Sequence, residues 1–394
     1  MFKLFKLKAV EYPIFILWVL IASLYIRPYN GIMAPFYDYG NYCVFLCSSY
    51  IVLKKRSIVE QRFKIIYVIL VTSILYLIMS RLLNGYVYEH KFSSIYIYNL
   101  ALVNLFTFGL VDNMWAKLKA FSFLLLIYSC INFITIILYP DGLYETEVYA
   151  GSNWFLGYKN VIIRTLLPCV TLNILCSIHD YGKPNIKDLF LMLISLYSVY
   201  LVDSSTSILI MLIFIIGIIL WYYKKQKMSL NLYKSFLVVT CVSIAFTMFS
   251  FQEYLSSLIE NLFEKDTTFT GRTYVWAFTL VKLLESPFIG FGWHSADEWR
   301  DVLGFYEMGF DMGFSHPHNF ILYILLQGGI LYLALFVFLC FYISKYCNQK
   351  LSYYFVLTLM YFSFFVEGIT ESLTGAVLLF PLFGLYPNFE RNNL

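Results

Sequence analysis

Long apolar runs recur along the whole chain and constrain its fold more than any other feature of the sequence. A transmembrane helix needs about 20 mainly apolar residues, and runs close to that length lie between charged or turn-rich breaks. Hydrophobic residues make up 60% of the chain and charged residues 13%, against about 25% charged residues in an ordinary soluble domain. We therefore predict an all-α integral membrane protein. Its twelve predicted membrane-spanning helices are 12–27, 37–53, 65–83, 95–111, 120–139, 161–178, 189–203, 207–223, 235–251, 320–344, 351–369 and 374–389.

The same composition excludes other classes of protein. The chain is too apolar for a disordered segment, and a net charge of +4 does not fit a basic protein that binds nucleic acid. Its eight cysteines contain no Cys-x-x-Cys pair and lie in or beside apolar runs, so we expect buried thiols and no metal site. No small-residue cleavage site follows the first apolar run, which we interpret as a retained helix.

Basic and acidic residues are divided unevenly between the two sets of predicted loops. With a cytoplasmic N-terminus and twelve crossings, most of the 28 Lys and Arg face the cytoplasm and most of the 24 Asp and Glu face outside. Cytoplasmic loops of membrane proteins are enriched in Lys and Arg. We therefore expect a multi-pass protein with both termini in the cytoplasm.

Two predicted outer loops, 140–160 and 252–319, are much longer than the other connections. Long connections in a compact protein are usually functional. The loop 252–319 has amphipathic patterns, notably within 274–284, which predict short helices along the outer membrane face. Residues 1–394 then form a single polytopic membrane domain with its functional site on the outer side.

Polar residues near the predicted helix 161–178 are candidates for that site. Arg164 lies close to its start, Asn160 precedes Arg164 by four residues, and Lys159 is adjacent. An Arg at the centre of a membrane helix costs about 2.5–3.5 kcal/mol, so such residues usually have a function. Arg164 could instead extend to the lipid headgroups without a further role. Arg81, at the end of an earlier helix, is interpreted as an ordinary interfacial anchor.

Histidines are concentrated just before the predicted helix 320–344, where the sequence reads SHPHNF. Asn319 or Ser315 can cap this helix, and Pro suits a first helical turn. A single His at a helix start is usually structural, but His316 and His318 together, beside the long loop, indicate a functional site.

Charged residues on other segments could join this site. Glu367 and Glu371 share a face at the outer end of a predicted helix, where they could pair with an Arg or orient a histidine. Arg272 lies in the long loop, at the head of an amphipathic segment that Thr270 or Gly271 can cap.

The predicted topology brings several helix starts to the outer side. The helices that begin near 161, 207 and 320 all run inward, and each start carries unpaired N–H groups and about half a positive charge. Such starts bind phosphate or pyrophosphate. The residues that accompany them are Lys159, Asn160 and Arg164, then Ser204, Ser205, Thr206 and Ser207, and finally His316 to Asn319.

Two spaced patterns carry a family resemblance. The first is a Gly-Arg, a helix and a Pro-x-x-Gly-x-Gly turn, here Gly271, Arg272, Pro287, Gly290 and Gly292. The second is His-Asn, nine residues, a Gly and, after two more, a Tyr, here His318, Asn319, Gly329 and Tyr332. With these patterns, residues 150–372 resemble the bacterial O-antigen ligase and O-antigen or capsule polymerase superfamily of membrane glycosyltransferases.

The resemblance implies a GT-C-like enzyme of the bacterial inner membrane, without metal or cofactor, that acts on glycans carried by undecaprenyl pyrophosphate at the outer face. Arg164 and Arg272 would stabilise the departing pyrophosphate, and His318 would orient or deprotonate the acceptor hydroxyl. The implied partners are lipid-linked donor and acceptor, membrane lipids, a chain-length regulator and a flippase. The implied substrate-binding residues are Lys159, Asn160, His316, Asn319, Ser205, Glu367 and Glu371.

The sequence leaves alternatives open. We favour a polymerase, because the chain departs freely from tight family motifs, but a ligase that transfers glycan to lipid A-core carries the same His-Asn spacing. A flippase or other transporter also commonly has about twelve helices, although the chain shows no repeat of one half in the other. A metal-dependent membrane glycosyltransferase would carry paired acids in its first outer loop, where 27–37 has none.

Overall fold

The computed structural model describes residues 30–59, 61–86, 92–111, 113–145, 152–248, 269–294, 296–303, 317–346, 352–369 and 379–384. These residues are mostly helical, with one small hairpin of β1 (Asn153–Trp154) and β2 (Gly157–Tyr158). The described helices are α2 (Asn30–Lys55), α3 (Gln61–Leu83), α4 (Phe92–Thr107), α5 (Met114–Leu138), α6 (Ile163–Tyr181), α7 (Ile186–Leu201), α8 (Ser205–Tyr223), α9 (Leu232–Met248), α11 (Phe269–Leu283), α12 (Ala296–Val302), α13 (Phe320–Tyr346), α14 (Ser352–Glu367) and α15 (Pro381–Gly384).

The mostly helical character predicted from the sequence is confirmed for the described residues. Within them, four helices are long and apolar enough to cross a membrane by length and composition, namely α3 from Phe63 to Leu83, α5, α8 and α13. Every predicted span from 37–53 to 351–369 contains a helix, whereas 12–27 and most of 374–389 lie outside the described residues. The count of twelve crossings stays a prediction.

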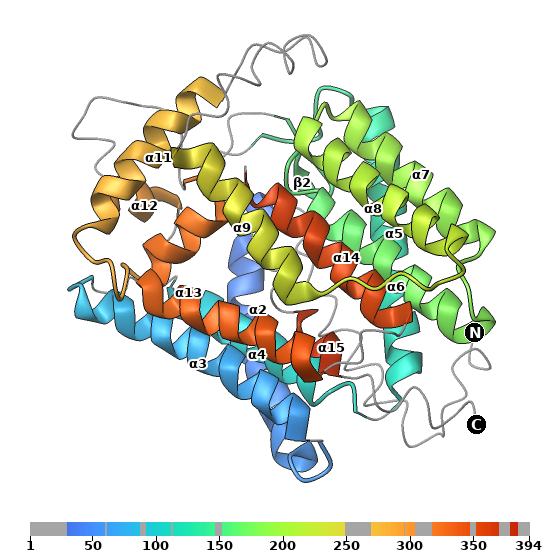
Figure 1. The fold of residues 1–394 in the computed structure, drawn as a ribbon, viewed down its shortest axis with the longest axis horizontal. Helices are drawn as coiled ribbons and strands as arrows, with labels where there is room; N and C mark the ends of the chain where they lie inside the picture. The colour runs from blue at the N-terminus through green and yellow to red at the C-terminus, as the bar shows by residue number, and fades with distance from the viewer. Residues whose placement is uncertain are drawn as a thin grey trace.

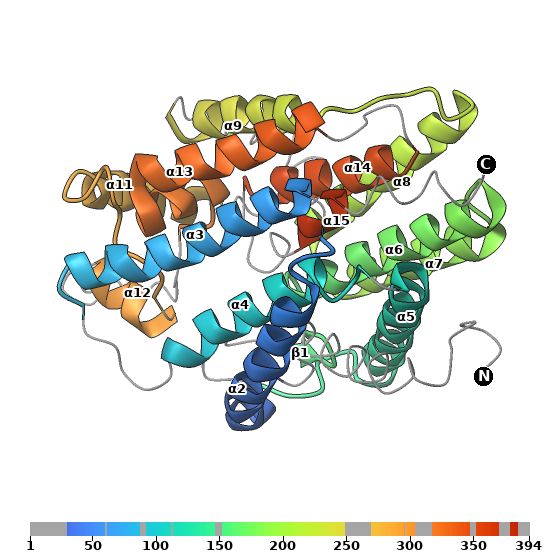
Figure 2. The ribbon, with the colours of Figure 1, turned by 90° about the horizontal axis from the view of Figure 1, so that it is seen from below.

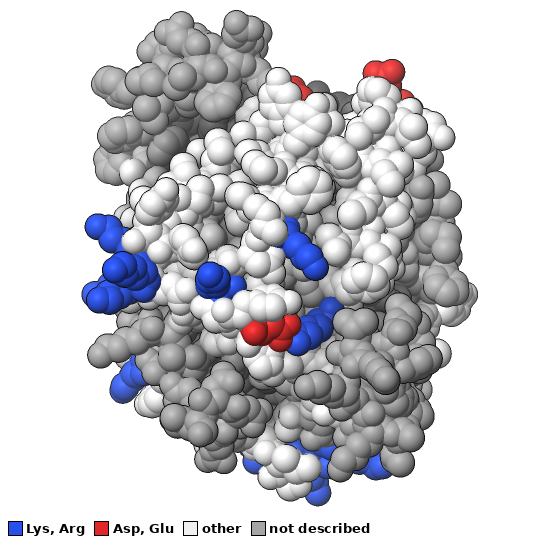
Figure 3. All heavy atoms as spheres, turned by 90° about the vertical axis from the view of Figure 1, so that its right-hand side faces the viewer, with Lys and Arg blue, Asp and Glu red and all other residues white. Residues whose placement is uncertain are grey.

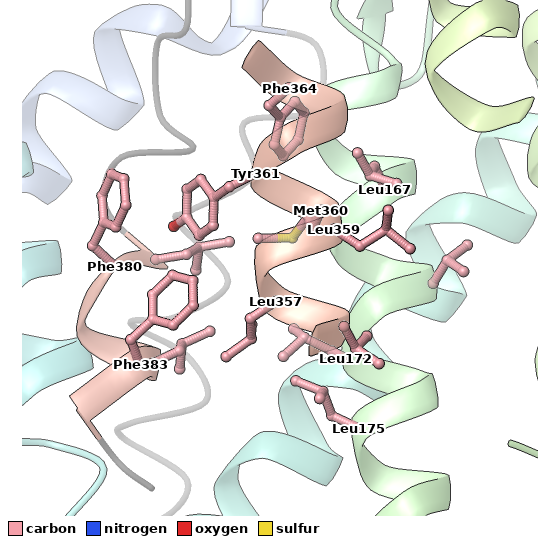
Figure 4. Packing of buried hydrophobic residues seen from close by; sticks show 14 of the residues in the cluster. Leu167, Leu172, Leu175, Leu357, Leu359, Met360, Tyr361, Phe364, Phe380 and Phe383 are labelled. Carbon is pink, nitrogen blue, oxygen red and sulfur yellow. The ribbon is translucent and has the colours of Figure 1, made fainter. Parts of the chain in front are cut away.

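Helix α14 lies in the middle of the bundle, between α6, α8 and α9 (Figure 1, Figure 2). Most of its side chains are buried. Leu359 extends toward α6 beside Leu167, while Phe380 and Phe383 cover the opposite side (Figure 4). An apolar helix that packs on all sides is typical of a bundle core.

Aromatic contacts fix the directions of the helices around α14. Trp221 of α8 stacks on Phe355 at 5.5 Å between ring centroids, and Gly217 allows close approach to Leu359. Residue numbers thus rise along α8 as they fall along the part of α14 that it contacts. Trp115 similarly joins His179 of α6 to the first turns of α14. Both α6 and α8 therefore run antiparallel to α14.

Helix α9 runs antiparallel to α13. Tyr233 packs on Phe341 at 5.6 Å between ring centroids, and the other end of α9 contacts the residue that precedes α13. Helix α13 also packs against α3, which lies beside it in both views (Figure 1, Figure 2). These directions place the starts of α6, α8 and α13 and the end of α14 at one end of the bundle, which we call the site end.

The opposite end of the bundle, which we call the basic end, carries exposed lysines. Gln226 links its connections, since Gln226 Nε2 donates to Gly182 O (3.2 Å) and Ser352 Oγ donates to Gln226 Oε1 (3.1 Å). On the face shown in Figure 3, a broad area without charged side chains separates Lys and Arg from the acidic residues at the top of the view. Such an area without charged side chains, between charged ends, suits a lipid environment. The exposed lysines are Lys183, Lys187, Lys224, Lys225 and Lys227.

Candidate functional site

The segment that precedes α13 is held by its own cap. Asn319 Oδ1 accepts hydrogen bonds from the main-chain N–H groups of Ile321 (3.0 Å) and Leu322 (3.1 Å). Asn319 is thus the N-cap that the sequence predicted as one of two choices. His318 precedes it with a φ of 47° and a half-buried side chain.

Residues from other helices fix the same segment in place. Ser243 of α9 exchanges hydrogen bonds with the Asn319 amide, at 3.2 Å to Oδ1 and 2.9 Å from Nδ2. Trp276 of α11 donates from Nε1 to Pro317 O at 2.8 Å. The Phe320 N–H donates to Gly368 O, just past the end of α14. His318 therefore stands at a junction of α9, α11, α13 and α14.

Glu367 is the last residue of α14 and is buried, with 4% of its surface exposed. It precedes Gly368, whose carbonyl accepts from Phe320, so Glu367 belongs to the same junction as His318. His316 and Glu371, which the sequence also assigned to the site, lie outside the described residues.

A second junction joins the starts of α6 and α8. Ser204 Oγ donates to Asn160 Oδ1 at 2.9 Å and lies 2.7 Å from Ser207 Oγ. Ser205 begins α8 and is half-buried. The prediction that Asn160 shares a helical face with Arg164 is wrong, because α6 begins only at Ile163 and Asn160 lies in the turn before it.

Arg164 lies in the first turn of α6, and both Arg164 and Lys159 are half-buried. The hairpin ahead of α6 is fixed to α5, since Trp154 Nε1 donates to Tyr139 O at 2.8 Å and the Leu156 N–H donates to Asn132 Oδ1 at 2.9 Å. The described residues 152–160 of the predicted outer loop thus pack on the bundle and place Lys159 and Asn160 at the site end, just before Arg164 of α6.

Arg272 lies in the first turn of α11, and only its main chain is described. Thr270 and Gly271 do not cap this helix as expected, because α11 already begins at Phe269. Position 272 is one helical turn before Trp276, which contacts Pro317 beside His318. The structure thus brings the main chain at 272 and His318 to neighbouring elements, with Arg164 at the same end of the bundle.

The Pro-Gly turn, residues 287–292, occupies a kink in α13. The kink is at Gly329, whose φ of 63° and ψ of −164° interrupt an otherwise continuous helix. A Cβ on Gly290 would lie 2.5 Å from the main-chain nitrogen of Gly328, so the close approach requires glycine. The main-chain bonds that join turn and kink are Phe291 N to Leu326 O (2.9 Å), Gly292 N to Gln327 O (2.7 Å) and Ile330 N to Pro287 O (2.9 Å).

Arg81 is not an ordinary interfacial anchor, as the sequence had indicated. Its side chain is buried and forms a bidentate ion pair with Glu298 of α12, at 2.5 Å from Nη2 to Oε1 and 3.1 Å from Nη1 to Oε2. Nη1 also donates to Trp293 O at 3.0 Å. An Arg that is exposed at a membrane surface would extend toward water, whereas this one is enclosed by the long loop.

His294 completes this buried cluster. Burial, followed by the positive charge of Arg81, lowers the pKa of His294 to about 4, so its imidazole is neutral near pH 7. Nε2 lies 2.9 Å from Phe291 O. Because a carbonyl only accepts hydrogen bonds, Nε2 carries the ring proton. Tyr86 and Trp299 pack edge-on against the ring at 4.8 and 4.7 Å.

An apolar cavity of about 390 Å³ lies between α9 and α13, on the basic-end side of the kink. Its lining has no carboxylate, imidazole or amine, so it is not a place for acid–base chemistry or phosphate binding. The lining residues are Tyr233, Ile330, Leu333, Ala334, Val337, Phe338 and Phe341.

Residues 190–337 match the family model described as O-antigen ligase, which covers less than half of the 394-residue chain. No curated protein and no solved structure matches the chain significantly. The chain therefore carries an O-antigen ligase domain at these residues, which confirms the resemblance to the O-antigen ligase and polymerase superfamily. The matched residues include Ser205, Arg272, His318 and Asn319.

Proposed function

We propose that this protein is a membrane glycosyltransferase that polymerises O-antigen or capsule repeat units. The growing glycan leaves undecaprenyl pyrophosphate and joins a hydroxyl of the next lipid-linked repeat unit at the outer face of the inner membrane. One observation carries this proposal: within the O-antigen ligase domain, His318 stands half-buried at the capped start of α13, at the junction with α9, α11 and α14.

The site end suits a pyrophosphate leaving group. Helices α6, α8 and α13 begin there, and each start contributes about half a positive charge. Arg164 and Arg272 supply full charges, and the planar guanidinium can bind phosphate oxygens in pairs. These groups would stabilise the negative charge that develops as the bond between the anomeric carbon and the pyrophosphate breaks.

His318 would orient the acceptor hydroxyl and take up its proton as the new glycosidic bond forms. Glu367, buried one residue before Gly368, would favour a positively charged imidazole at that stage. Lys159, Asn160, Ser205, Asn319, His316 and Glu371 would bind the sugars and phosphates around the reacting atoms.

The ligase reaction is an equally consistent second candidate, because the matched family is described as O-antigen ligase. In that reaction the finished glycan passes from the same type of donor to lipid A-core. The chemistry at the anomeric carbon is unchanged, and only the acceptor differs.

Deletion of the gene, followed by electrophoresis of surface glycan, separates these reactions. If only a single repeat unit remains attached, the protein is a polymerase. If no repeat unit is attached while long lipid-linked glycan accumulates, the protein is a ligase. A block in flipping would instead leave lipid-linked repeats on the cytoplasmic side, and this result would contradict both proposals.

Variants test the proposed site. We expect His318→Ala and Arg272→Ala each to abolish long-chain glycan, with the protein still present in the membrane fraction. His179→Ala and Arg56→Ala are matched controls, since these residues lie in the basic-end half of the molecule, His179 beside Trp115 and Arg56 just after α2. Normal glycan in both His318→Ala and Arg272→Ala would contradict the proposed function.

A further inference from the structure

Parts of the chain that are distant in sequence meet at the end of α3. The last turns of α3 face the Pro-Gly turn and the kink of α13, and their side chains donate to main-chain carbonyls of both. These bonds are Tyr76 Oη to Gly328 O (2.9 Å), Ser80 Oγ to Ile289 O (2.6 Å) and Asn84 Nδ2 to Gly290 O (2.7 Å). Helix α3 and the residue that follows it therefore hold the turn inside the kink through hydrogen bonds to main-chain carbonyls.

Arg81 extends this contact to α12. Its guanidinium donates hydrogen bonds to both carboxylate oxygens of Glu298 and to the Trp293 carbonyl. A bidentate pair fixes orientation as well as distance. Arg81 thus sets the position of the segment between the Pro-Gly turn and α12 relative to α3.

The energetics of this ion pair favour a geometric role. Arg81 has 1% of its surface exposed, while the Glu298 side chain is about a third exposed. The desolvation of a buried ion pair largely cancels its attraction, so replacement of both partners by apolar residues is often neutral for stability, whereas removal of one partner leaves the other charge without its counter-ion. A membrane helix end would be satisfied by an Arg that reaches water. Stability alone does not explain why this Arg is enclosed.

The Pro-Gly turn is connected to the candidate site by two routes. Through the kink it fixes Leu326 and Gln327, about two helical turns after the Asn319 cap of α13. The second route is α11, which directly precedes the turn in the chain and whose Trp276 donates to Pro317 O. Helix α11, the Pro-Gly turn and the first half of α13 therefore form a closed loop of contacts that includes position 272 and His318.

We propose that Arg81 is a positioning residue for glycan transfer, which acts through Glu298 and the Trp293 carbonyl to hold α11 and the start of α13 in register. This role rests on the proposed function, because it concerns the placement of Arg272 and His318 at the pyrophosphate and acceptor. Arg81 itself does not contact the reacting atoms.

Purified variants in nanodiscs, supplied with the lipid-linked repeat units that accumulate in the deletion strain, test this role. We expect Arg81→Met to lower kcat about 100-fold, the usual effect of a displacement of about 1 Å at a reacting centre, with KM changed less than about threefold. Arg81→Lys keeps the cation but not the bidentate grip, so it should recover about tenfold of the lost kcat. Glu298→Gln keeps an acceptor oxygen for Arg81, so its kcat should be higher than that of Glu298→Leu.

Lys119→Met is the matched control, because it removes an exposed ion pair with Asp180 outside this contact network. It should leave kcat unchanged. Wild-type kcat in Arg81→Met would overturn the proposal. So would a fall in kcat that is matched by an equal loss of folded protein in a thermal melt, because a purely structural role predicts that result.

Hydrogen–deuterium exchange separates this inference from the proposed function. Arg81→Met should raise exchange at 288–294 and 318–322, and Lys119→Met should not. Unchanged exchange at both segments would overturn the proposal. If the wild-type protein transfers no glycan while Arg81→Met still raises exchange there, the proposed function fails and the coupling between Arg81 and His318 stands.

Discussion

The two ends of the bundle handle polar groups in opposite ways. At the basic end, five lysines are exposed, although Lys117 is buried and donates to Gly109 O. The connections there are linked by a few side chains such as Gln226. At the site end, polar side chains are withdrawn from the surface and bridge helices that are far apart in sequence. Those with at most 2% of their surface exposed include Arg81, Ser204, His294 and Asn319.

This difference indicates what each end is built for. An exposed lysine keeps its hydration and costs little, whereas a buried polar group costs about 1–3 kcal/mol unless each hydrogen bond is made. At the site end many polar side chains are buried, and specific hydrogen bonds offset the free energy that their burial costs. It is therefore the end where the relative position of helices matters, and substitutions there should affect more than stability.

Two glycines give the largest expected contrast between the ends. A Cβ at Gly329 would overlap the main-chain carbon and oxygen of Phe288, and its φ of 63° with ψ of −164° is a region used almost only by glycine. At the basic end, Gly182 has a φ of 69° but open space around it. We expect Gly329→Ala to cost at least about 3 kcal/mol of unfolding free energy and Gly182→Ala about 1 kcal/mol.

Thermal melts in detergent measure both costs, and a gel of surface glycan reports the effect in cells. Gly329→Ala should give little folded protein and no long glycan, while Gly182→Ala should give a normal ladder. Equal melting temperatures for the two variants would show that the Pro-Gly turn does not pack into the kink.

A pH dependence should arise at the site end from His294. Its pKa is lowered to about 4 by burial and by Arg81, whereas an unfolded His titrates near 6.5. Between these pH values only the unfolded chain binds the proton, so the free energy of unfolding falls as the pH is lowered from about 6.5 to 4. The full loss is about 3 kcal/mol at 1.4 kcal/mol per pH unit.

Melting curves of wild type and His294→Gln between pH 4 and 8 isolate this contribution, because all carboxylates titrate in both proteins. Gln keeps a donor for Phe291 O but has no titration. The difference in melting temperature between the two should change steadily below pH 6.5. A constant difference across the range would show that His294 titrates normally, and hence that it is not buried beside Arg81.

The sequence predicted the local features of the site end well. Apolar run lengths placed most helix ends to within about four residues, although α2 and α5 begin seven and six residues before their predicted spans. The SHPHNF segment correctly offered Asn319 as a cap. Such features depend on neighbouring residues, which a sequence displays directly. Whether His318 and Arg272 carry the chemistry stays a prediction.

The contact that joins the end of α3 to α12 was not predicted. Arg81 and Glu298 are 217 residues apart, and only the packing of α3 against the long loop brings them together. The helical-face prediction for Asn160 failed because the chain before α6 forms a turn instead of helix. The kink at Gly329 did have a local signal, since a pair of glycines inside an apolar run favours a bend.

Helix caps give a smaller, matched contrast. Asn185 caps α7 at the basic end, where it accepts from the N–H groups of Lys187 and Asp188, and Asn319 caps α13 at the site end. Loss of either cap should cost about 1 kcal/mol of unfolding free energy. Only Asn319→Ala should also lower glycan transfer, because Asn319 adjoins His318 and bonds Ser243.

Asn319→Ser keeps an accepting oxygen for the cap, adds no charge at this buried position and loses the bond from Nδ2 to Ser243. It should restore the melting temperature, and it should restore transfer only in part. Transfer that falls equally in Asn185→Ala and Asn319→Ala would show that both caps act through stability alone.

The smallest effect is expected from the ion pair of Lys119 and Asp180. The two side chains are 31% and 35% exposed and lie 2.6 Å apart, and exposed pairs contribute about 0–1 kcal/mol because water already solvates both charges. Lys119→Met should therefore shift the melting temperature little, and any shift should shrink further at high salt. In the same salt titration, any difference in melting temperature between Arg81→Met and wild type should stay nearly unchanged, because the buried Arg81 side chain is shielded from salt ions. If both variants respond alike to salt, the two ends do not differ in how they hold their charges.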